Sequence, residues 1–450
     1  MENITFENYR CFGARRTARL APLTLLVGPN STGKTSFMAL LRAMLDVSIR
    51  EEVPDFREAA FDMGSFEDVV HRERSSNEPM SFFEAEVTTK PRYGANSGLI
   101  TFRSRFESRA AAPFPVARAI SSDGRSFEAE TLSSGEMKVR FVNRDEEYAQ
   151  ILDTFRFLSD DSELVPFQSL LSRLMFGSTR EREGEWPDQQ TALALRQFRS
   201  NVLYRLQPRD RARVREPYFA AGPVRSKPVR TYDLIRPTRD SEGEYVPTYM
   251  ATLYRKGGPD WETLRAKLER FGQESGLFGD ITVDPMRGND GSPFQIKVRE
   301  YDVLGLGSER AYRNLTDVGY GVSQILPILI ELFRIDAPDT FLLQQPEVHL
   351  HPSAQAALGS LLCDIAADRH QLVVETHSDY LIDRIRMDVR DRTTKLDPEE
   401  VSILYFEPSD SDVNIHSVTI DNLGNVLGTP PSYGDFFMHE TNRSIGVLTD

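Results

Sequence analysis

The sequence predicts an α/β fold in which both ends of the chain build one mixed, largely parallel sheet. Three apolar runs have the length of buried strands, and each precedes a turn and a helical pattern: LTLLV (23–27), FLLQ (341–344) and LVVET (372–376). Strands that alternate with helices form parallel sheets, because each helical crossover returns the chain to the same edge of the sheet. The first and the last part of the chain therefore meet in one layer.

Two further segments complete the predicted fold. MSFFEAEV (80–87) alternates apolar and polar residues, which is typical of a half-buried antiparallel strand and predicts an antiparallel β-subdomain. Residues 96–289 are less regular and combine charge-rich helical patterns with loops rich in Pro, Gly and Arg. We expect them to form an inserted lobe that is helical and irregular.

The composition argues against several classes of protein. The 450 residues carry a net charge of -14, so no global basic field is available to hold nucleic acid. Cys11 and Cys363 are the only cysteines, which argues against a disulfide framework and against a cysteine-based zinc site. The N-terminal segment lacks the apolar core of a signal peptide, and the longest apolar run, ILPILIELF, is too short to cross a membrane. We expect a cytoplasmic protein without membrane contact.

A phosphate-binding pattern follows the first apolar run. Residues 28–35 read GPNSTGKT and match G-x-x-x-x-G-K-[ST] between a buried strand and a helix. Glycines let backbone N–H groups turn toward phosphate oxygens, Lys34 reaches the β- and γ-phosphates, and the Thr35 hydroxyl joins the Mg²⁺ shell. Chance produces roughly 0.02 such matches in a chain of this length, so the pattern predicts nucleotide binding. The candidate binding residues are Gly28, Pro29, Asn30, Ser31, Thr32, Gly33, Lys34, Thr35 and Ser36.

Four motifs occur in an order that resembles the ATP-binding-cassette (ABC) ATPases: VGPNSTGKTS, VGYGVSQ, FLLQQPEVHLHP and VVETHSDYL. The nearest resemblance is to the bacterial "AAA family ATPases" of the predicted-ATPase class, relatives of OLD-type and SMC-type heads that occur in anti-phage defence systems. It covers about the first 90 and the last 150 residues, and GPVRSKPVRTY (222–232) resembles a Gly-Pro-Leu-Arg segment of that class. The resemblance implies an ABC-type P-loop NTPase head from residues 1–95 and 290–425, an inserted lobe at 96–289 and a C-terminal tail at 426–450.

In such a head, VGYGVSQ stands where the family has its signature loop. The resemblance implies that this loop meets the γ-phosphate of ATP bound to the other subunit, so that a homodimer or a higher homo-oligomer closes around the nucleotide. Taken alone, a GxGxS turn before a helix is more often a helix cap, and Pro327 predicts that the helix starts close by. The candidate signature residues are Gly319, Gly321, Ser323 and Gln324.

Histidines follow both of the later apolar runs. His377 stands where the family has a switch histidine that bonds the γ-phosphate, although a lone histidine after a strand is usually a satisfied polar residue. His349 and His351 suggest a metal pair, but no third ligand lies near them in the sequence. The family's D-loop, which contacts the partner subunit, is the better interpretation of that segment.

Two amides occupy the positions at which the family carries carboxylates. Gln344 stands in the place of the Walker B acid, so the expected Mg²⁺ ligands are Thr35 and Gln344, with one charge fewer than usual. Gln345 stands in the place of the general base, and a neutral amide positions water but cannot take its proton. We therefore predict ATP and Mg²⁺ binding with weak ATP hydrolysis.

Other carboxylates lie close in the sequence. Glu347 on the turn and Glu375 at the end of LVVE are catalytic candidates beside Gln345 and His377, although a structural D-loop role is the better interpretation of Glu347. The sequence does not separate natural glutamines from substitutions introduced to trap ATP, and it identifies no Q-loop residue.

Three functions remain open. The first is a dimerising ATP switch. No long coiled coil is present, which argues against an SMC-type arm protein, and the roughly 70 residues after His377 are too few for an appended nuclease domain, so we expect a separate effector. The resemblance implies a role in anti-phage defence, with a separately encoded nuclease or toxin as that effector. The second is a DNA-maintenance ATPase that uses the arginine-rich segment 209–230, for which a solvated face is the alternative. The third is a scaffold in which ATP is structural.

Overall fold

A computed structural model describes most of the chain, in two compact units. The described residues are 1–57, 59–73, 78–90, 98–144, 146–152, 193–198, 216–234, 238–286, 293–301, 311–409 and 412–434. The first unit comprises Met1–Leu20, Asn30–Val214 and Phe406–Ile415, and the second comprises Ala21–Pro29, Arg215–Tyr405 and His416–Asp450. The chain thus passes from the second unit into the first within the phosphate-binding pattern.

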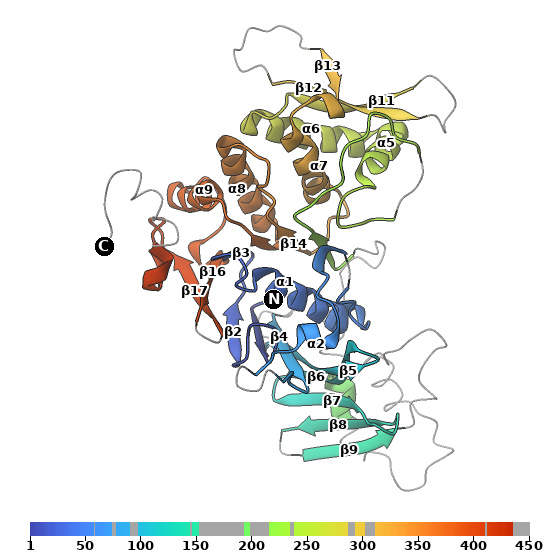
Figure 1. The fold of residues 1–450 in the computed structure, drawn as a ribbon, viewed down its shortest axis with the longest axis vertical. Coiled ribbons are helices and arrows are strands. Elements are labelled where there is room, and N and C mark those ends of the chain that lie inside the picture. Colours follow the sequence, from blue (N-terminus) through green and yellow to red (C-terminus); the bar gives the residue numbers. More distant parts are fainter. Residues whose placement is uncertain are drawn as a thin grey trace. The chain divides into compact units, whose positions relative to one another are not determined.

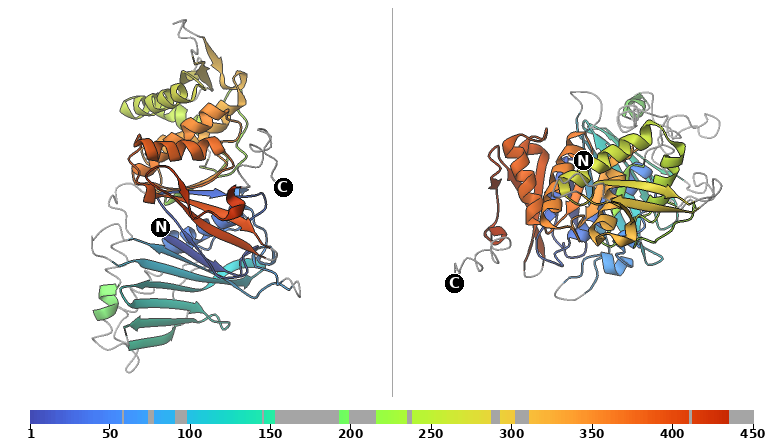
Figure 2. Two further views of the ribbon diagram at one scale, coloured as in Figure 1. Left: turned by 90° about the vertical axis from the view of Figure 1, so that its left-hand side faces the viewer. Right: turned by 90° about the horizontal axis from the view of Figure 1, so that it is seen from above.

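The first unit is built on an eight-stranded antiparallel sheet with the order β2-β1-β4-β5-β6-β7-β8-β9 (Figures 1 and 2). Along β4, Phe83, Ala85 and Val87 are buried and the residues between them are partly exposed, which confirms the alternation in MSFFEAEV. The strands are β1 (Asn3–Glu7), β2 (Arg16–Arg19), β4 (Phe83–Thr89), β5 (Ile100–Arg109), β6 (Ala112–Ser122), β7 (Arg125–Thr131), β8 (Met137–Asn143) and β9 (Glu146–Leu152).

Aromatic rings connect the helix after the phosphate-binding pattern to this unit. Helix α1 (Lys34–Leu45) continues into a π-helical turn, η1 (Asp46–Arg50), and two short helical segments follow, η2 (Ala59–Phe61) and α2 (Phe66–Val69). The ring centroid of Phe37 lies 5.8 Å from that of Phe6 and 5.6 Å from that of Phe406. Edge-to-face pairs of this kind add stability beyond the area that they bury.

Residues 100–152 differ from the helical and irregular lobe that we expected at 96–289. In the described part they form the five strands β5 to β9. Asp123 and Gly124 both have positive φ, at 54° and 74°, and connect β6 to β7. An Asp-Gly pair between two alternating segments favours a type I′ hairpin turn, so the sequence does carry a signal for these strands. The boundaries of the inserted lobe stay a prediction.

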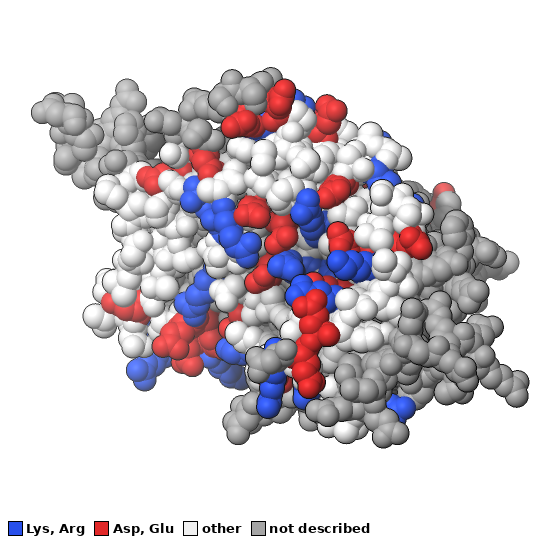
Figure 3. Space-filling view, turned by 90° about the horizontal axis from the view of Figure 1, so that it is seen from below, with Lys and Arg blue, Asp and Glu red and all other residues white. Residues whose placement is uncertain are grey.

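Several charged side chains on the surface of the first unit form ion pairs. Arg140 contacts Glu128 and Glu147, and Arg103 contacts Glu128 as well. On the face seen in Figure 3, the described Lys and Arg residues are interspersed with Asp and Glu. That face therefore presents mixed charge instead of a continuous basic patch.

The second unit contains most of a seven-stranded sheet with the order β10-β14-β15-β3-β16-β17-β18. The first five strands run parallel to one another, and β18 pairs with β17 in the antiparallel direction. This arrangement confirms the predicted α/β class with a mixed, largely parallel sheet. The strands are β3 (Leu23–Val27), β10 (Tyr218–Ala221), β14 (Thr340–Gln344), β15 (Gln371–Glu375), β16 (Val401–Pro408), β17 (Val413–Ile420) and β18 (Val426–Leu427).

Helices and a small second sheet complete this unit. A three-stranded antiparallel sheet consists of β11 (Asp280–Pro285), β12 (Phe294–Arg299) and β13 (Tyr312–Asn314). The helices are α5 (Val246–Lys256), α6 (Pro259–Ser275), α7 (Tyr320–Phe333), α8 (Pro352–Ala367) and α9 (Asp379–Asp391), with 3₁₀ turns at η4 (Leu315–Asp317) and η5 (Pro398–Glu400). Among the described residues, no helix combines the length and the apolarity that a membrane crossing requires.

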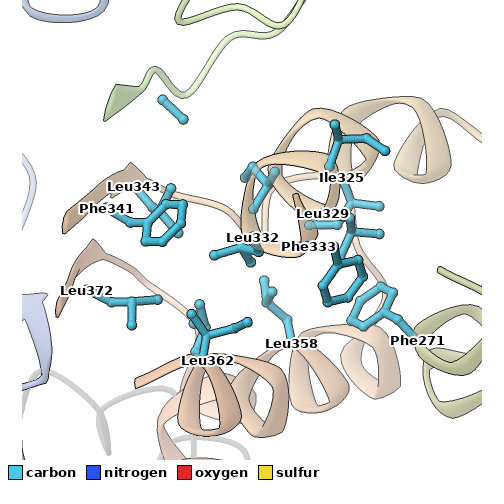
Figure 4. Close-up of a cluster of buried hydrophobic side chains, with 14 of the residues drawn as sticks. Phe271, Ile325, Leu329, Leu332, Phe333, Phe341, Leu343, Leu358, Leu362 and Leu372 are labelled. Atoms are coloured by element: carbon cyan, nitrogen blue, oxygen red, sulfur yellow. The ribbon is translucent and has the colours of Figure 1, made fainter. Parts of the chain in front are cut away.

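The core of the second unit joins the parallel strands to three helices (Figure 4). Phe341 and Leu343 of β14 and Leu372 of β15 belong to one buried cluster. The same cluster includes Ile325, Leu329, Leu332 and Phe333 of α7, Leu358 and Leu362 of α8, and Phe271 of α6. Because β14, β15 and α7 carry candidate site residues at their ends, this packing supports the elements that position the site.

Candidate functional site

The phosphate-binding loop has the backbone conformation that its sequence predicts. Gly28, Ser31 and Gly33 have positive φ, at 137°, 64° and 85°, and helix α1 begins at Lys34 with no acidic residue in its first turn. A Cβ atom at Gly33 would lie 2.4 Å from the Sγ atom of Cys11, so only glycine fits both the conformation and the space. Curled backbone before a helix N-terminus binds anions, and the loop therefore fits a nucleotide phosphate.

The two glutamines lie where β14 ends beside β15. Gln344 pairs with Glu375 in the parallel ladder, and the N–H of Gln345 donates to the carbonyl oxygen of Glu375 at 2.8 Å. The chain then turns through residues 345–350, which we call the glutamine turn. Gln345 and His349 adopt positive φ there, at 42° and 69°. Positive φ at residues other than glycine is strained and concentrates at functional sites.

Glu347 connects the glutamine turn to the segment after β15. Its Oε1 atom accepts a hydrogen bond from the backbone N–H of His377 at 2.8 Å, and the residue is 6% exposed. Burial raises the pKa of the Glu347 carboxyl, against the hydrogen bond from His377 and the charge of Arg225, which lower it. One oxygen of Glu347 is thus anchored, and the other, Oε2, is buried without a hydrogen-bond partner among the described residues.

The structure brings three of the candidate residues together here. Glu347, Glu375 and His377 lie at the carboxyl ends of two adjacent strands, as their positions after FLLQ and LVVE predict. The side chain of His377 is exposed, which leaves it accessible to a ligand. Parallel strands present their carboxyl ends at one edge of a sheet, the usual place for ligands in α/β folds.

The expected signature segment forms the N-terminus of α7 and contacts the glutamine turn. A Cβ atom at Gly321 would lie 2.7 Å from the carbonyl oxygen of His349, and the rings of Tyr320 and His349 meet edge-to-face at 4.9 Å. The hydroxyl of Ser323 donates to the carbonyl of Tyr320 at 2.8 Å, and Gln324 is buried. Gly321 therefore allows the backbone of α7 to approach the backbone of the glutamine turn closely. This packing within one chain is enough to explain why a glycine stands at position 321.

Helix α7 opens at the Gly-rich turn, as the sequence predicts, but Pro327 lies beyond its first turn. Pro327 lies inside α7, which begins at Tyr320. Almost all of α7 is buried, so tertiary packing compensates for the hydrogen bond that a proline removes from a helix interior.

The expected Mg²⁺ ligands fall into different units. Thr35 belongs to the first unit and Gln344 to the second, so their joint role stays a prediction. Among the residues that the structure describes, no group of three or more His, Cys, Asp or Glu side chains is placed to hold a metal ion.

The arginine-rich segment, expected as a DNA contact in one hypothesis, is occupied by internal interactions where the structure describes it. Residues 209–215 lie outside the described part. Arg225 is 2% exposed, and Arg230 forms a salt bridge with Asp317. These two arginines do not form an open basic face.

Sequence reasoning missed Arg225 as a candidate site residue. Its guanidinium donates to the carbonyl oxygens of Gln324, Gln344 and Gln345, which belong to the signature helix and to the end of β14. The signal was present, because GPVRSKPVRTY was the segment of the middle region that resembled the ATPase class. Resemblance alone did not indicate what Arg225 contacts.

A comparison with protein families decides the class of this chain. A family model described as "AAA domain, putative AbiEii toxin, Type IV TA system" matches residues 23–383, which is more than half of the chain. The chain belongs to this AAA-domain family. It is accordingly a P-loop ATPase, and the family implies the use of a nucleotide and typically of Mg²⁺.

Solved structures similar to this AAA-domain protein are heads of SMC proteins. An SmcHead bound to the C-winged helix domain of ScpA has a TM-score of 0.45 at 11% identity and covers 93% of this chain and 97% of its own. The SMC head domain from Thermotoga maritima has a TM-score of 0.40 at 11% identity, covering 93% and 98%. A Smc head with an extended coiled coil from Pyrococcus furiosus, bound to the C-terminal domain of ScpA, has a TM-score of 0.43 at 10% identity, covering 93% and 96%. Likeness at this level carries no argument about function. A search of curated proteins finds no match.

The two signature glycines should respond differently to alanine. Gly321→Ala places a methyl group against the His349 carbonyl, and overpacking of this kind costs about 1–3 kcal/mol. The gain in helix propensity is about 1 kcal/mol, so we expect a net loss of stability in thermal or denaturant unfolding. Gly319→Ala is the matched control, because a Cβ atom there meets nothing within 4 Å. Equal unfolding midpoints for the two variants would contradict the close approach.

Proposed function

We propose that this protein binds ATP with Mg²⁺, closes head-to-head on a second copy, and thereby switches a separately encoded effector in bacterial anti-phage defence. The observation that carries the proposal is the combination of a phosphate-binding loop in binding conformation with two amides at the strand end where the related ATPases carry acids. Binding is thus retained while proton abstraction is weakened. The family description, which names a toxin and a type IV TA system, supports an effector of the toxin or nuclease kind.

Each candidate residue has a role in this proposal. Lys34 would neutralise the β- and γ-phosphates, and the backbone of residues 28–33 would surround them. Thr35 and Gln344 would hold Mg²⁺, which supplies charge neutralisation at the phosphates when it is bound. Gln345 would orient the attacking water. Residues 319–324 would contact the ATP that is bound to the partner copy. His377 would form a hydrogen bond with the γ-phosphate of the ATP bound to the same copy.

Glu347 is our candidate for the proton acceptor. The amide of Gln345 cannot take a proton, whereas Glu347 presents a buried oxygen, Oε2, without a hydrogen-bond partner among the described residues. Burial raises the pKa of this carboxyl, which brings it closer to the operating pH that suits a general base. The anchored Oε1 atom keeps the structural role expected of a D-loop residue, so the two interpretations of Glu347 apply to its two oxygens.

Turnover tests the roles of Gln345 and Glu347. General-base assistance is worth on the order of 10²–10⁴ in rate, so we expect Gln345→Glu to raise the steady-state ATPase rate by up to that factor. Glu347→Gln keeps the volume and the acceptor for the His377 N–H, and we expect it to abolish the residual hydrolysis of the unaltered chain. Phosphate release would be measured for all three proteins. If the unaltered chain hydrolyses ATP rapidly and Glu347→Gln does not slow it, this assignment is contradicted. If even Gln345→Glu does not hydrolyse ATP, the scaffold alternative is favoured.

ATP-dependent association tests the head-to-head closure. We expect the mass in light scattering to double with ATP and Mg²⁺ and to persist, because hydrolysis is slow. Lys34→Ala should remain a monomer because it loses phosphate binding. Ser323→Arg should bind ATP but remain a monomer, since the added charge and bulk occupy the N-terminus of α7. Association that is identical with and without ATP would exclude the closure as a nucleotide switch.

Phage infection tests the effector. Cells that express this chain together with its genomic neighbours should survive phage infection, and Lys34→Ala should remove that protection. Deletion of one neighbouring gene should remove it equally, since this chain is proposed to act through a partner. Full protection by this chain alone would refute the separate effector while leaving the ATPase roles untouched.

A further inference from the structure

Arg225 is a charged residue in the interior of the second unit. It lies in the irregular segment directly after β10, the strand that runs parallel to β14. Its side chain is 2% exposed, whereas the preceding residue, Val224, is 73% exposed. The segment therefore directs the guanidinium inward, although burying a charge without a close ion pair costs free energy.

The guanidinium of Arg225 connects three segments that are far apart in the sequence. The Nη1 atom donates to the carbonyl oxygen of Gln324 at 3.3 Å, and the Nη2 atom donates to the carbonyl oxygens of Gln344 and Gln345, each at 3.2 Å. All three acceptors are backbone atoms, so the bridge fixes the course of the main chain at these three residues. The planar fork of an arginine suits such a bridge, whereas a lysine is a single point donor.

The environment of Arg225 leaves polar atoms unsatisfied. Among the described residues of the second unit, the buried side-chain atoms without a hydrogen-bond partner are Nε of Arg225, Nε2 of Gln324 and Oε2 of Glu347. Arg225 bonds the backbone of Gln324 and interacts electrostatically with Glu347. Buried polar groups are nearly always satisfied in proteins, so an unsatisfied cluster needs a reason other than stability, such as catalysis.

Arg225 keeps its charge in this environment. Burial lowers the pKa of its guanidinium to about 10, and the nearby Glu347 carboxylate opposes that change. The group therefore remains protonated near neutral pH, and its Nη1 and Nη2 atoms donate the hydrogen bonds described above.

We propose that Arg225 is a positioning residue for ATP hydrolysis, which locks the glutamine turn to the start of helix α7 and orients Glu347. The inference rests on the proposed hydrolytic role of that turn. The hydrogen bonds of Arg225 go to backbone carbonyls, so it acts on the site through the main chain. Its effect would reach the reacting atoms through Gln345 and Glu347, so it should change the rate of the chemical step more than the affinity for ATP.

Separate measurement of binding and turnover tests the proposal on the full chain. For Arg225→Met, we expect the Kd for ATP with Mg²⁺ to stay within about twofold, while the single-turnover rate constant falls roughly 10- to 100-fold, as for a lost hydrogen-bonded charge. Arg225→Lys keeps the charge, and its single-turnover rate constant should lie between those of Arg225→Met and the unaltered chain, because a lysine cannot bridge all three carbonyls. Arg230→Met is the matched control from the same segment, whose exposed arginine pairs with Asp317, and we expect no change in rate.

A purely structural role would give a different result. In that case Arg225→Met would lower the unfolding midpoint but leave the rate per ATP-binding site unchanged, which would overturn the proposal. If Arg225→Met does not fold, Arg225→Lys decides: a rate equal to that of the unaltered chain overturns the proposal, and a reduced rate with unchanged Kd supports it.

Hydrogen exchange separates this inference from the proposed function. Loss of the arginine should speed amide exchange in residues 345–350 and 320–324 relative to Arg230→Met, even without nucleotide. Unchanged exchange there would overturn the positioning role. If the unaltered chain neither binds nor hydrolyses ATP, the proposed function fails, and the exchange measurement still decides whether Arg225 holds these segments together.

Discussion

The pairing of Gln344 with Glu375 is the contact on which the candidate site depends. It sets the ends of β14 and β15 at the same level, so that the glutamine turn and His377 emerge side by side at one edge of the parallel sheet. Glu347 can then accept from the N–H of His377 and close the connection between the two strand ends. A slip of one residue in this ladder would invert the side chains along β14 and separate these groups.

Burial of the charged side chains of Arg225 and Glu347 near the carboxyl edge of the parallel sheet costs free energy that packing alone would not offset. Arg225 and Glu347 are both nearly inaccessible to solvent, and each keeps one polar atom without a partner among the described residues. Apolar residues of similar volume often match or exceed the stability of such buried charges. The arrangement is therefore better understood as one that fixes the backbone of the glutamine turn for a reaction than as one that stabilises the fold.

The sequence predicted the parts of this protein that depend on local pattern. The apolar runs at 23–27, 341–344 and 372–376 became the central parallel strands β3, β14 and β15, because buried strands need continuous apolar residues. The strands between 100 and 152 were missed, although Asp123-Gly124 marked one of their hairpins. The role of Arg225 could not be predicted, because its acceptors lie 99, 119 and 120 residues away in sequence and are backbone carbonyls that carry no residue-specific signal.

In the proposed function, the amides at Gln344 and Gln345 would give the ATP-bound state a long lifetime and leave the phosphate-binding loop itself unchanged. General-base assistance contributes on the order of 10²–10⁴ to a rate, so an amide at position 345, with Glu347 as a less favourably placed acceptor, would extend the proposed ATP-bound period by up to that factor. A motor requires rapid clearance of ATP, whereas a switch requires that the bound state outlast the event that triggers it. A glutamine that positions water, a partly anchored Glu347 and a fixed backbone turn together suit slow clearance, and this is why we interpret ATP here as a signal and not as fuel.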